Sequence, residues 1–151
     1  MEGQKNESTD KQGVGVTNVQ LCDVQKPEPQ ANEVHIKISY CGICGTDLHI
    51  IADEYPATYP VIIGHEYSGV VDAIGSEVEN ITTGDRVVFL TAAHYCGKCA
   101  LCTRGAIMMC PERKSIGYGV NGAMASIIMK DILQFYIMQF HSGQYSLIIL
   151  Q

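Results

Sequence analysis

Residues 64–78 read GHEYSGVVDAIGSEV, and this stretch decides the fold class of the chain. Its middle part, EYSGVVDAIG, is bounded by glycine and predicts a short strand. Further strands are expected at residues 19–23, 33–41, 85–90 and 123–129. In the second of these segments, EVHIKISYC, apolar and polar residues alternate as in a half-buried strand. Because short strands at close spacing are typical of barrels and sandwiches, the sequence predicts a mainly β fold.

The composition is that of one globular domain. A chain of 151 residues can bury a core, and its 46% hydrophobic and 17% charged residues argue against overall disorder. The net charge is -6, without a cluster of lysine and arginine. Since a nucleic-acid surface needs a basic face that displaces counterions from phosphates, we expect no nucleic acid as a partner.

The N-terminal residues are polar throughout. MEGQKNESTDKQG has no apolar segment, so we expect residues 1–13 to be a disordered leader and not a secretion signal. No stretch of the chain reaches the roughly 18 uninterrupted apolar residues of a membrane span, so no membrane contact is expected. We therefore expect a cytoplasmic protein in which the seven cysteines are reduced and available as metal ligands.

Four of these cysteines stand close together in the segment CGKCALCTRGAIMMC. Cys96, Cys99, Cys102 and Cys110 are separated by two, two and seven residues. Zn²⁺ takes four thiolates in a tetrahedron, and four cysteines fill such a site completely, so the segment predicts a closed structural zinc site. Incidental buried cysteines or a redox pair are the alternatives. A zinc ribbon that binds nucleic acid is a third, but the segment holds only Lys98 and Arg104 as basic residues.

A second group of metal-ligand types lies upstream, in CGICGTDLH at 41–49 and in GHE at 64–66. Cys44, His65 and Glu66 offer a thiolate, an imidazole and a carboxylate, which is the mixed ligand set of an open catalytic zinc. Taken alone, the same residues also suit a small core cysteine and a hydrogen-bonded histidine. The residue pattern by itself leaves both interpretations open.

Together these segments resemble the zinc-containing medium-chain alcohol dehydrogenases, in particular the polyol (sorbitol) and threonine dehydrogenase branch. The resemblance is carried by CGICGTDLH, YPVIIGHEYSGVVDAIGSEV, GDRVV, the four-cysteine segment and GAMAS, and it covers residues 14–126. It implies a GroES-like β-barrel domain with short helices and a zinc-binding lobe.

The resemblance also implies a role for each matching residue. Cys44 and His65 would ligate a catalytic zinc, with Glu66 either a third ligand or a close neighbour of the ion. Asp47 would orient His65 by accepting its free N–H. Thr46 matches the hydroxyl that takes the alcohol proton, and His49 matches the base that relays this proton to solvent. The implied reaction is the NAD(P)-linked oxidation of a secondary alcohol or polyol to a ketone.

Family enzymes continue into a Rossmann-type dinucleotide-binding domain, for which this chain has no room. We therefore expect a truncated dehydrogenase that holds up to two zinc ions and uses NAD(P) only if the missing domain is supplied. The alternative is a non-catalytic zinc-binding barrel or a defective fragment. The family forms homo-oligomers, but the resemblance does not extend that expectation to this fragment.

The last 25 residues, 127–151, differ in composition from the sequence before them. They contain one glycine, no proline and many isoleucine, phenylalanine and methionine residues. We interpret residues 127–151 as a divergent tail that arises from a shifted reading frame or an unspliced intron. An amphipathic helix is conceivable within it, with Ile128, Ile132, Phe135 and Tyr136 on one stripe.

Residues 117–122 read GYGVNG, which matches the G-x-G-x-x-G pattern of dinucleotide-binding loops. That pattern functions only between a strand and a helix, with an acidic residue about 20 positions further on. Here PERKS precedes the glycines, a predicted strand follows them, and the first downstream acid is Asp131. We therefore predict that this loop binds no dinucleotide and leads from the lobe back into the barrel.

Overall fold

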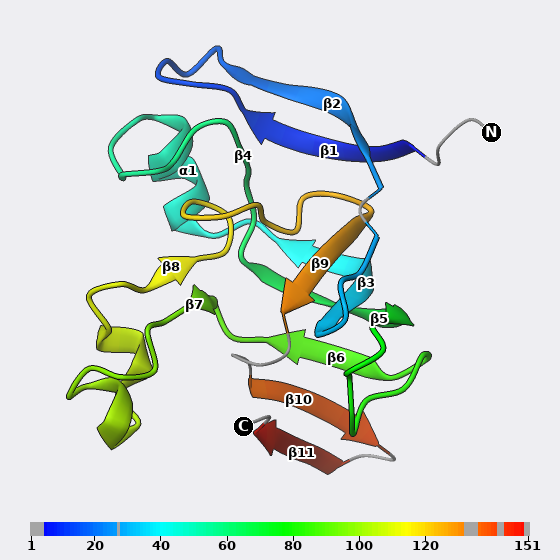
Figure 1. Cartoon of the computed structure of the whole chain (residues 1–151). Coiled ribbons are helices and arrows are strands. Elements are labelled where there is room, and N and C mark those ends of the chain that lie inside the picture. The colour runs from blue at the N-terminus through cyan, green and yellow to red at the C-terminus, as the bar shows by residue number, and fades with distance from the viewer. Residues whose placement is uncertain (1–4, 27, 132–135, 142–143, 150–151) are drawn as a thin grey trace.

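The structure, a computed structural model, describes residues 5–26, 28–131, 136–141 and 144–149. Its main sheet has six strands in the order β11-β10-β6-β5-β3-β9 (Figure 1). The neighbouring strands of this sheet are antiparallel. Their bounds are β3 Glu33–Gly42, β5 Glu66–Ile74, β6 Arg86–Phe89, β9 Ile127–Asp131, β10 Tyr136–His141 and β11 Gln144–Ile149. The chain therefore has the mainly β fold that the sequence predicts.

The core lies against the middle strands of this sheet. Along β5 the residues Tyr67, Gly69 and Val71 are buried, and the residues between them are more exposed. This alternation is the period of a strand with one face in the core. The buried cluster joins residues from distant parts of the chain: Val34, Ile36, Tyr67, Val71, Ile81, Val87, Ile116, Ala123 and Ile128. The strands predicted at 33–41, 66–75 and 85–90 are thus confirmed.

Part of the predicted disordered leader over 1–13 is an ordered strand, which corrects the prediction for residues 5–11. β1 (Lys5–Lys11) pairs with both β2 (Val19–Gln25) and β4 (Val61–Ile62) in a three-stranded sheet. Ser8 is 2% exposed and Lys11 is completely buried. The ammonium of Lys11 donates to the carbonyl oxygens of Gly15 at 2.6 Å and Ile51 at 3.1 Å. Polar side chains are therefore part of the interior of this end of the molecule.

The barrel also continues beyond residue 126, the expected end of the domain. β9 pairs with β3 from Lys37↔Ile127 to Glu33↔Asp131. Ile128 is 5% exposed and belongs to the core cluster. Residues 127–131 and 136–141 are strands, so no helix covers these positions, and residues 132–135 lie outside the described part of the chain. The first residues of the predicted tail thus complete the sheet.

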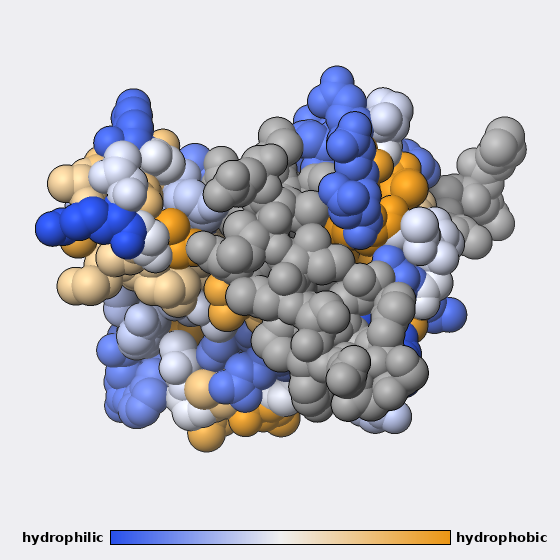
Figure 2. Space-filling model, turned by 90° about the horizontal axis from the view of Figure 1, so that it is seen from below, coloured by the Kyte–Doolittle hydropathy of each residue, from blue (hydrophilic) through white to orange (hydrophobic). Residues whose placement is uncertain are grey.

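A helix and a lobe lie on one side of the sheets (Figure 1). α1 (Gly45–Ile51) follows β3, and β7 (Ala92–His94) and β8 (Lys114–Ser115) form a small ribbon at the base of the lobe. The lobe contains two 3-10 turns, η1 (Cys102–Arg104) and η2 (Ile107–Met109). Figure 2 shows weakly hydrophobic side chains mixed with hydrophilic ones on the side where the lobe projects.

No helix in the described part of the chain combines the length and the apolar character that crossing a membrane requires.

Candidate metal centres

The structure brings the four cysteines of the lobe together. One sulfur atom from each of Cys96, Cys99, Cys102 and Cys110 lies within 4.8 Å of the other three. The Sγ–Sγ distances are 3.5 Å for Cys99–Cys102, 3.6 Å for Cys110–Cys96 and 3.9 Å for Cys96–Cys102. Four thiolates at about 2.3 Å from a tetrahedral zinc ion stand about 3.8 Å apart, so these residues fit a closed zinc site.

Backbone groups in the lobe favour thiolates at two of the four positions. The N–H of Cys102 donates to the sulfur of Cys99, which is the main reason why the pKa of Cys99 is lowered to about 7. The N–H of Cys96 has the same effect on the pKa of Cys110. Burial, and then the neighbouring Cys99 thiol, raises the pKa of Cys102 to about 12. Because a metal binds the thiolate form, binding to the four cysteines releases protons.

The second predicted group also converges. Ligand atoms of Cys44, His65 and Glu66 lie within 4.8 Å of one another. Cys44 is the residue that precedes α1, and His65 and Glu66 lie where the chain enters β5. His65 is 7% exposed, whereas Glu66 is exposed. A buried imidazole, a thiol and a solvent-facing carboxylate fit a zinc ion that keeps a coordination position open.

Asp47 lies beneath this group and is 1% exposed. Its Oδ2 accepts the N–H of Cys44 at 2.8 Å, and its Oδ1 accepts the N–H of Gly64 at 3.2 Å. Oδ1 also lies 3.2 Å from Nδ1 of His65, but the two atoms do not form a hydrogen bond. The predicted neighbour of His65 is therefore in place, whereas the predicted hydrogen bond is not formed.

Thr46 and His49 lie on α1 with a spacing of three residues, which places them on neighbouring positions of one helix face. The hydroxyl of Thr46 lies 3.8 Å from the sulfur of Cys44. His49 is exposed, and its Nδ1 lies 2.7 Å from Oε2 of Glu54. The structure thus places Thr46 next to the second group and His49 further toward solvent.

The glycine loop at 117–122 packs against the backbone beside His65. Gly64 and Gly117 have φ values of 94° and 83°, which favour glycine. A Cβ atom on Gly122 would lie 2.2 Å from the carbonyl oxygen of Gly64, so only glycine fits there. Neither a helix nor a long strand flanks this loop, since β8 ends at Ser115 and turns follow. The loop lacks the strand–helix frame of a dinucleotide site, as its sequence context predicts.

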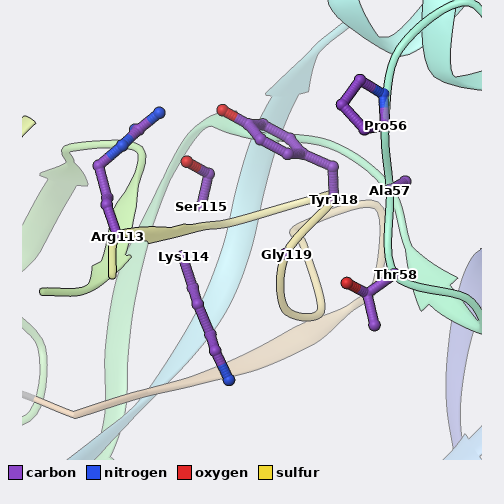
Figure 3. Close-up of a pocket in the computed structure, with 8 residues that line it drawn as sticks. All are labelled: Pro56, Ala57, Thr58, Arg113, Lys114, Ser115, Tyr118 and Gly119. Atoms are coloured by element: carbon purple, nitrogen blue, oxygen red, sulfur yellow. The ribbon is translucent and has the colours of Figure 1, made fainter. Parts of the chain in front are cut away.

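A pocket of about 340 Å³ next to this loop was not predicted from the sequence (Figure 3). Tyr118 lines it, and the Tyr118 ring packs edge-on to His65 with the centroids 6.0 Å apart. The ring of Tyr55 also packs edge-on to Tyr118, with the centroids 5.3 Å apart. The hydrogen bond with Tyr118 is the main reason why the pKa of Tyr55 is raised. The only feature of the sequence that indicates this pocket wall is an aromatic residue, Tyr118, between two glycines.

Comparisons with known proteins agree with this geometry. The family of alcohol dehydrogenase GroES-like domains matches residues 30–135, which extends past the expected limit at residue 126. D-arabitol-phosphate dehydrogenase of Enterococcus avium is 40% identical over 120 residues, or 79% of this chain and 34% of that protein. Sorbitol dehydrogenase of Halalkalibacterium halodurans is 39% identical over 107 residues, or 70% of this chain and 31% of that protein.

Among solved structures, a zinc-binding dehydrogenase of Sinorhizobium meliloti bound to NADP superimposes with a TM-score of 0.81 at 31% identity. The match covers 89% of this chain and 39% of that one. The chain thus spans about a third of the length of the curated relatives it matches. With the family match over most of its length, the chain belongs to the zinc-containing medium-chain alcohol dehydrogenases, of which it carries the GroES-like domain.

Proposed function

We propose that this chain provides the zinc-binding part of an NAD(P)-linked dehydrogenase that oxidises a secondary alcohol or polyol to a ketone. The observation that carries the proposal is the convergence of Cys44, His65 and Glu66, from two separate segments, within 4.8 Å. A structural role alone would not require a mixed ligand set with an exposed carboxylate, because closed zinc sites use four protein ligands.

In this proposal Cys44 and His65 hold the ion, and Glu66 is a third ligand or lies beside it. Since Nδ1 of His65 lies 3.2 Å from Asp47, the other ring nitrogen, Nε2, is the one available to the metal. A zinc ion held by these residues would supply a Lewis acid that lowers the pKa of an alcohol substrate.

The proton of the alcohol would leave along α1. The hydroxyl of Thr46, 3.8 Å from the sulfur of Cys44, is placed to accept it. His49 follows one turn later on an exposed part of the helix, where it would pass the proton to solvent. Its Nδ1 lies 2.7 Å from Oε2 of Glu54, a contact that would hold the ring at this end of the helix.

The four cysteines of the lobe would hold a second, structural zinc ion. Four protein thiolates leave no open position for substrate, so this ion would act on stability and not on the reaction. Structural zinc sites contribute on the order of 10 kcal/mol of apparent folding free energy, which is enough to order a lobe with few buried apolar residues.

A metal titration tests the proposed sites. We expect the metal-free chain to bind two zinc ions, and we expect His65→Gln to bind one and to keep the lobe ion. Cys99→Ser should lose the lobe ion first and lower the stability of the chain. Cys22→Ser is the matched control, because Cys22 belongs to neither group. A His65→Gln variant that still binds two ions with unchanged affinity would refute the proposed catalytic site.

A titration with NADH, followed by fluorescence, distinguishes the enzyme from a zinc-binding module. The described residues contain no βαβ unit that could hold a dinucleotide, which favours a module that needs a further domain for catalysis. Tight binding of NADH to the chain alone would instead favour a self-sufficient dehydrogenase. If the chain binds two zinc ions but no NADH, it is the zinc-binding module and needs a further domain for the reaction.

A further inference from the structure

The pocket beside Tyr118 has two walls that come from distant parts of the chain. Pro56, Ala57 and Thr58 form one wall, and residues 113–115, 118 and 119 form the other (Figure 3). The N–H of Thr58 donates to the carbonyl oxygen of Tyr118 at 2.7 Å, which ties the walls together. A volume of about 340 Å³ suits a small polar molecule.

The pocket adjoins the proposed catalytic zinc site. Tyr118, which lines the pocket, packs edge-on to the ring of His65. The Tyr118 segment also rests on the residue before His65, because Gly117 lies against the backbone of Gly64. A molecule in the pocket would therefore contact Tyr118, whose ring in turn contacts the proposed metal ligand His65.

The chemistry of the lining is cationic, although the chain as a whole has a net charge of -6. Arg113 and Lys114 line the pocket, and no carboxylate does. Within the described residues, neither Arg113 nor Lys114 has an ion-pair partner. In the view of Figure 3, the guanidinium of Arg113 and the hydroxyls of Ser115 and Tyr118 extend to one side of the pocket, and Lys114 extends to the other.

This lining suits a phosphate group better than a carboxylate. A phosphate monoester carries close to two negative charges and three acceptor oxygens, whereas a carboxylate carries one charge and two oxygens. Arg113 offers a planar pair of donors for two phosphate oxygens, and the hydroxyls of Ser115 and Tyr118, which extend to the same side, can donate to the remaining lone pairs. Lys114 adds positive charge on the opposite side of the pocket.

We propose that this pocket binds the phosphate group of a phosphorylated sugar alcohol whose reacting carbinol reaches the Cys44–His65–Glu66 group. The inference rests on the proposed function and narrows its substrate class from polyols to polyol phosphates. Arg113 is the principal phosphate ligand. Its backbone is held by the lobe, since the N–H of Arg113 donates to the carbonyl oxygen of Cys110 at 3.0 Å.

Calorimetric titrations of the zinc-loaded full chain test the proposal, with sorbitol 6-phosphate, sorbitol and inorganic phosphate as probes. We expect sorbitol 6-phosphate to bind at least about tenfold more tightly than sorbitol, because a hydrogen-bonded charge pair is added. Arg113→Gln should abolish this difference. Arg104→Gln is the matched control, because it removes the same charge from an exposed arginine of the lobe outside the pocket.

Two results would overturn the proposal. One is an Arg113→Gln variant that binds sorbitol 6-phosphate as tightly as Arg104→Gln does. The other is inorganic phosphate binding as tightly as sorbitol 6-phosphate, which would assign the pocket to a free anion and not to a substrate.

The same titration with His65→Gln separates this inference from the proposed function. Retained binding of sorbitol 6-phosphate that still depends on Arg113 would support the pocket without any contribution from the metal. If the unmodified chain binds zinc only at the lobe, the proposed function is refuted. The effect of Arg113→Gln on the binding of sorbitol 6-phosphate then still decides whether the pocket binds phosphate.

Discussion

Asp47 connects the start of α1 to the histidine of the candidate catalytic site. Its two oxygens accept the N–H groups of Cys44 and Gly64, so one buried carboxylate holds the backbone before both metal-ligating segments. We expect Asp47→Asn to weaken zinc binding at the Cys44–His65–Glu66 group about 10- to 100-fold, as the loss of such a supporting group does at other metal sites. The affinity is measured by competition with a chelator.

The lobe is the internal control for this variant. Its four cysteines have no contact with Asp47 among the described interactions, so their zinc affinity should stay unchanged. An equal loss at both sites would show that the Asp47→Asn substitution destabilises the whole fold, and unchanged affinity at both would contradict the supporting role of Asp47.

Asp53 is the counterion of the completely buried Lys11, at 3.1 Å. A hydrogen bond from the N–H of Gly15, and then Lys11, lowers the pKa of Asp53. A lowered folded-state pKa means that Asp53 stabilises the fold above its unfolded pKa of about 3.9 and loses this contribution as the pH falls through the folded value. We therefore expect Asp53→Asn to lower the free energy of unfolding at pH 7 and to have a smaller effect at pH 3, measured by urea unfolding.

Asp72→Asn is the matched control for the pH experiment. Asp72 pairs with Lys26 at the same distance, 3.1 Å, but both side chains are partly exposed. Exposed pairs contribute about 0–1 kcal/mol, so this variant should change the unfolding free energy little at either pH. Equal effects of the two variants at pH 7 would contradict a special role for the buried lysine.

At the scale of elements, the sequence predicts the strands in which apolar and polar residues alternate. A strand made only of polar residues is not predicted. β3 and β5 have the alternation, and both are found where it predicts them. β1 reads KNESTDK and has no apolar residue. It is a strand because β2 and β4 pair with its backbone and because its buried side chains bond to one another, as in the 2.6 Å hydrogen bond from Ser8 to Asp10. No periodicity can predict such a buried polar strand.

The glycine loop at 117–122 supports the metal site through contact between backbones. The N–H of Gly122 donates to the carbonyl oxygen of Ile62, and a Cβ on Gly122 would lie 2.2 Å from the carbonyl oxygen of Gly64. We expect Gly122→Ala to destabilise the chain by about 1–3 kcal/mol, the usual cost of overpacking, and to weaken zinc binding by His65. Urea unfolding and the zinc titration measure the two effects.

Gly13→Ala controls for the general effect of replacing glycine. A Cβ on Gly13 would have no neighbour within 4 Å, so this variant should be neutral or slightly stabilising. A Gly122→Ala variant as stable as Gly13→Ala, with full zinc content, would show that the loop can move away from Gly64 at little cost.

At the scale of the whole molecule, the sequence predicts the metal ligands better than their surroundings. The spacing within the lobe restricts four cysteines to one short loop, so their convergence follows from local geometry. The meeting of Cys44 with His65 depends on the path of β3, α1 and β5, and a family resemblance was needed to predict it. The pocket combines residues 56–58 with 113–119, and no local pattern indicates that these segments meet.

The end of the folded domain is the last feature that can be tested on the whole molecule. A chain that ends at residue 126 lacks β9, whereas a chain that ends at residue 131 keeps it and keeps Ile128 in the core. We expect the shorter chain to be the less stable by several kcal/mol, because the loss of a buried isoleucine side chain alone costs about 2–5 kcal/mol. Urea unfolding of the two zinc-loaded chains measures this difference.

Point variants separate the contribution of Ile128 from that of the strand. Ile128→Ala in the full chain should lower the unfolding free energy, and Leu90→Ala, at a site that is 41% exposed, should not. Loss of β9 should also lower the zinc affinity of the Cys44–His65–Glu66 group more than that of the lobe. The reason is that β9 follows the segment in which the N–H of Ala123 donates to the carbonyl oxygen of Gly64, the residue before His65. Equal stability and zinc content of the chains ending at 126 and 131 would instead place the domain boundary at Ser126.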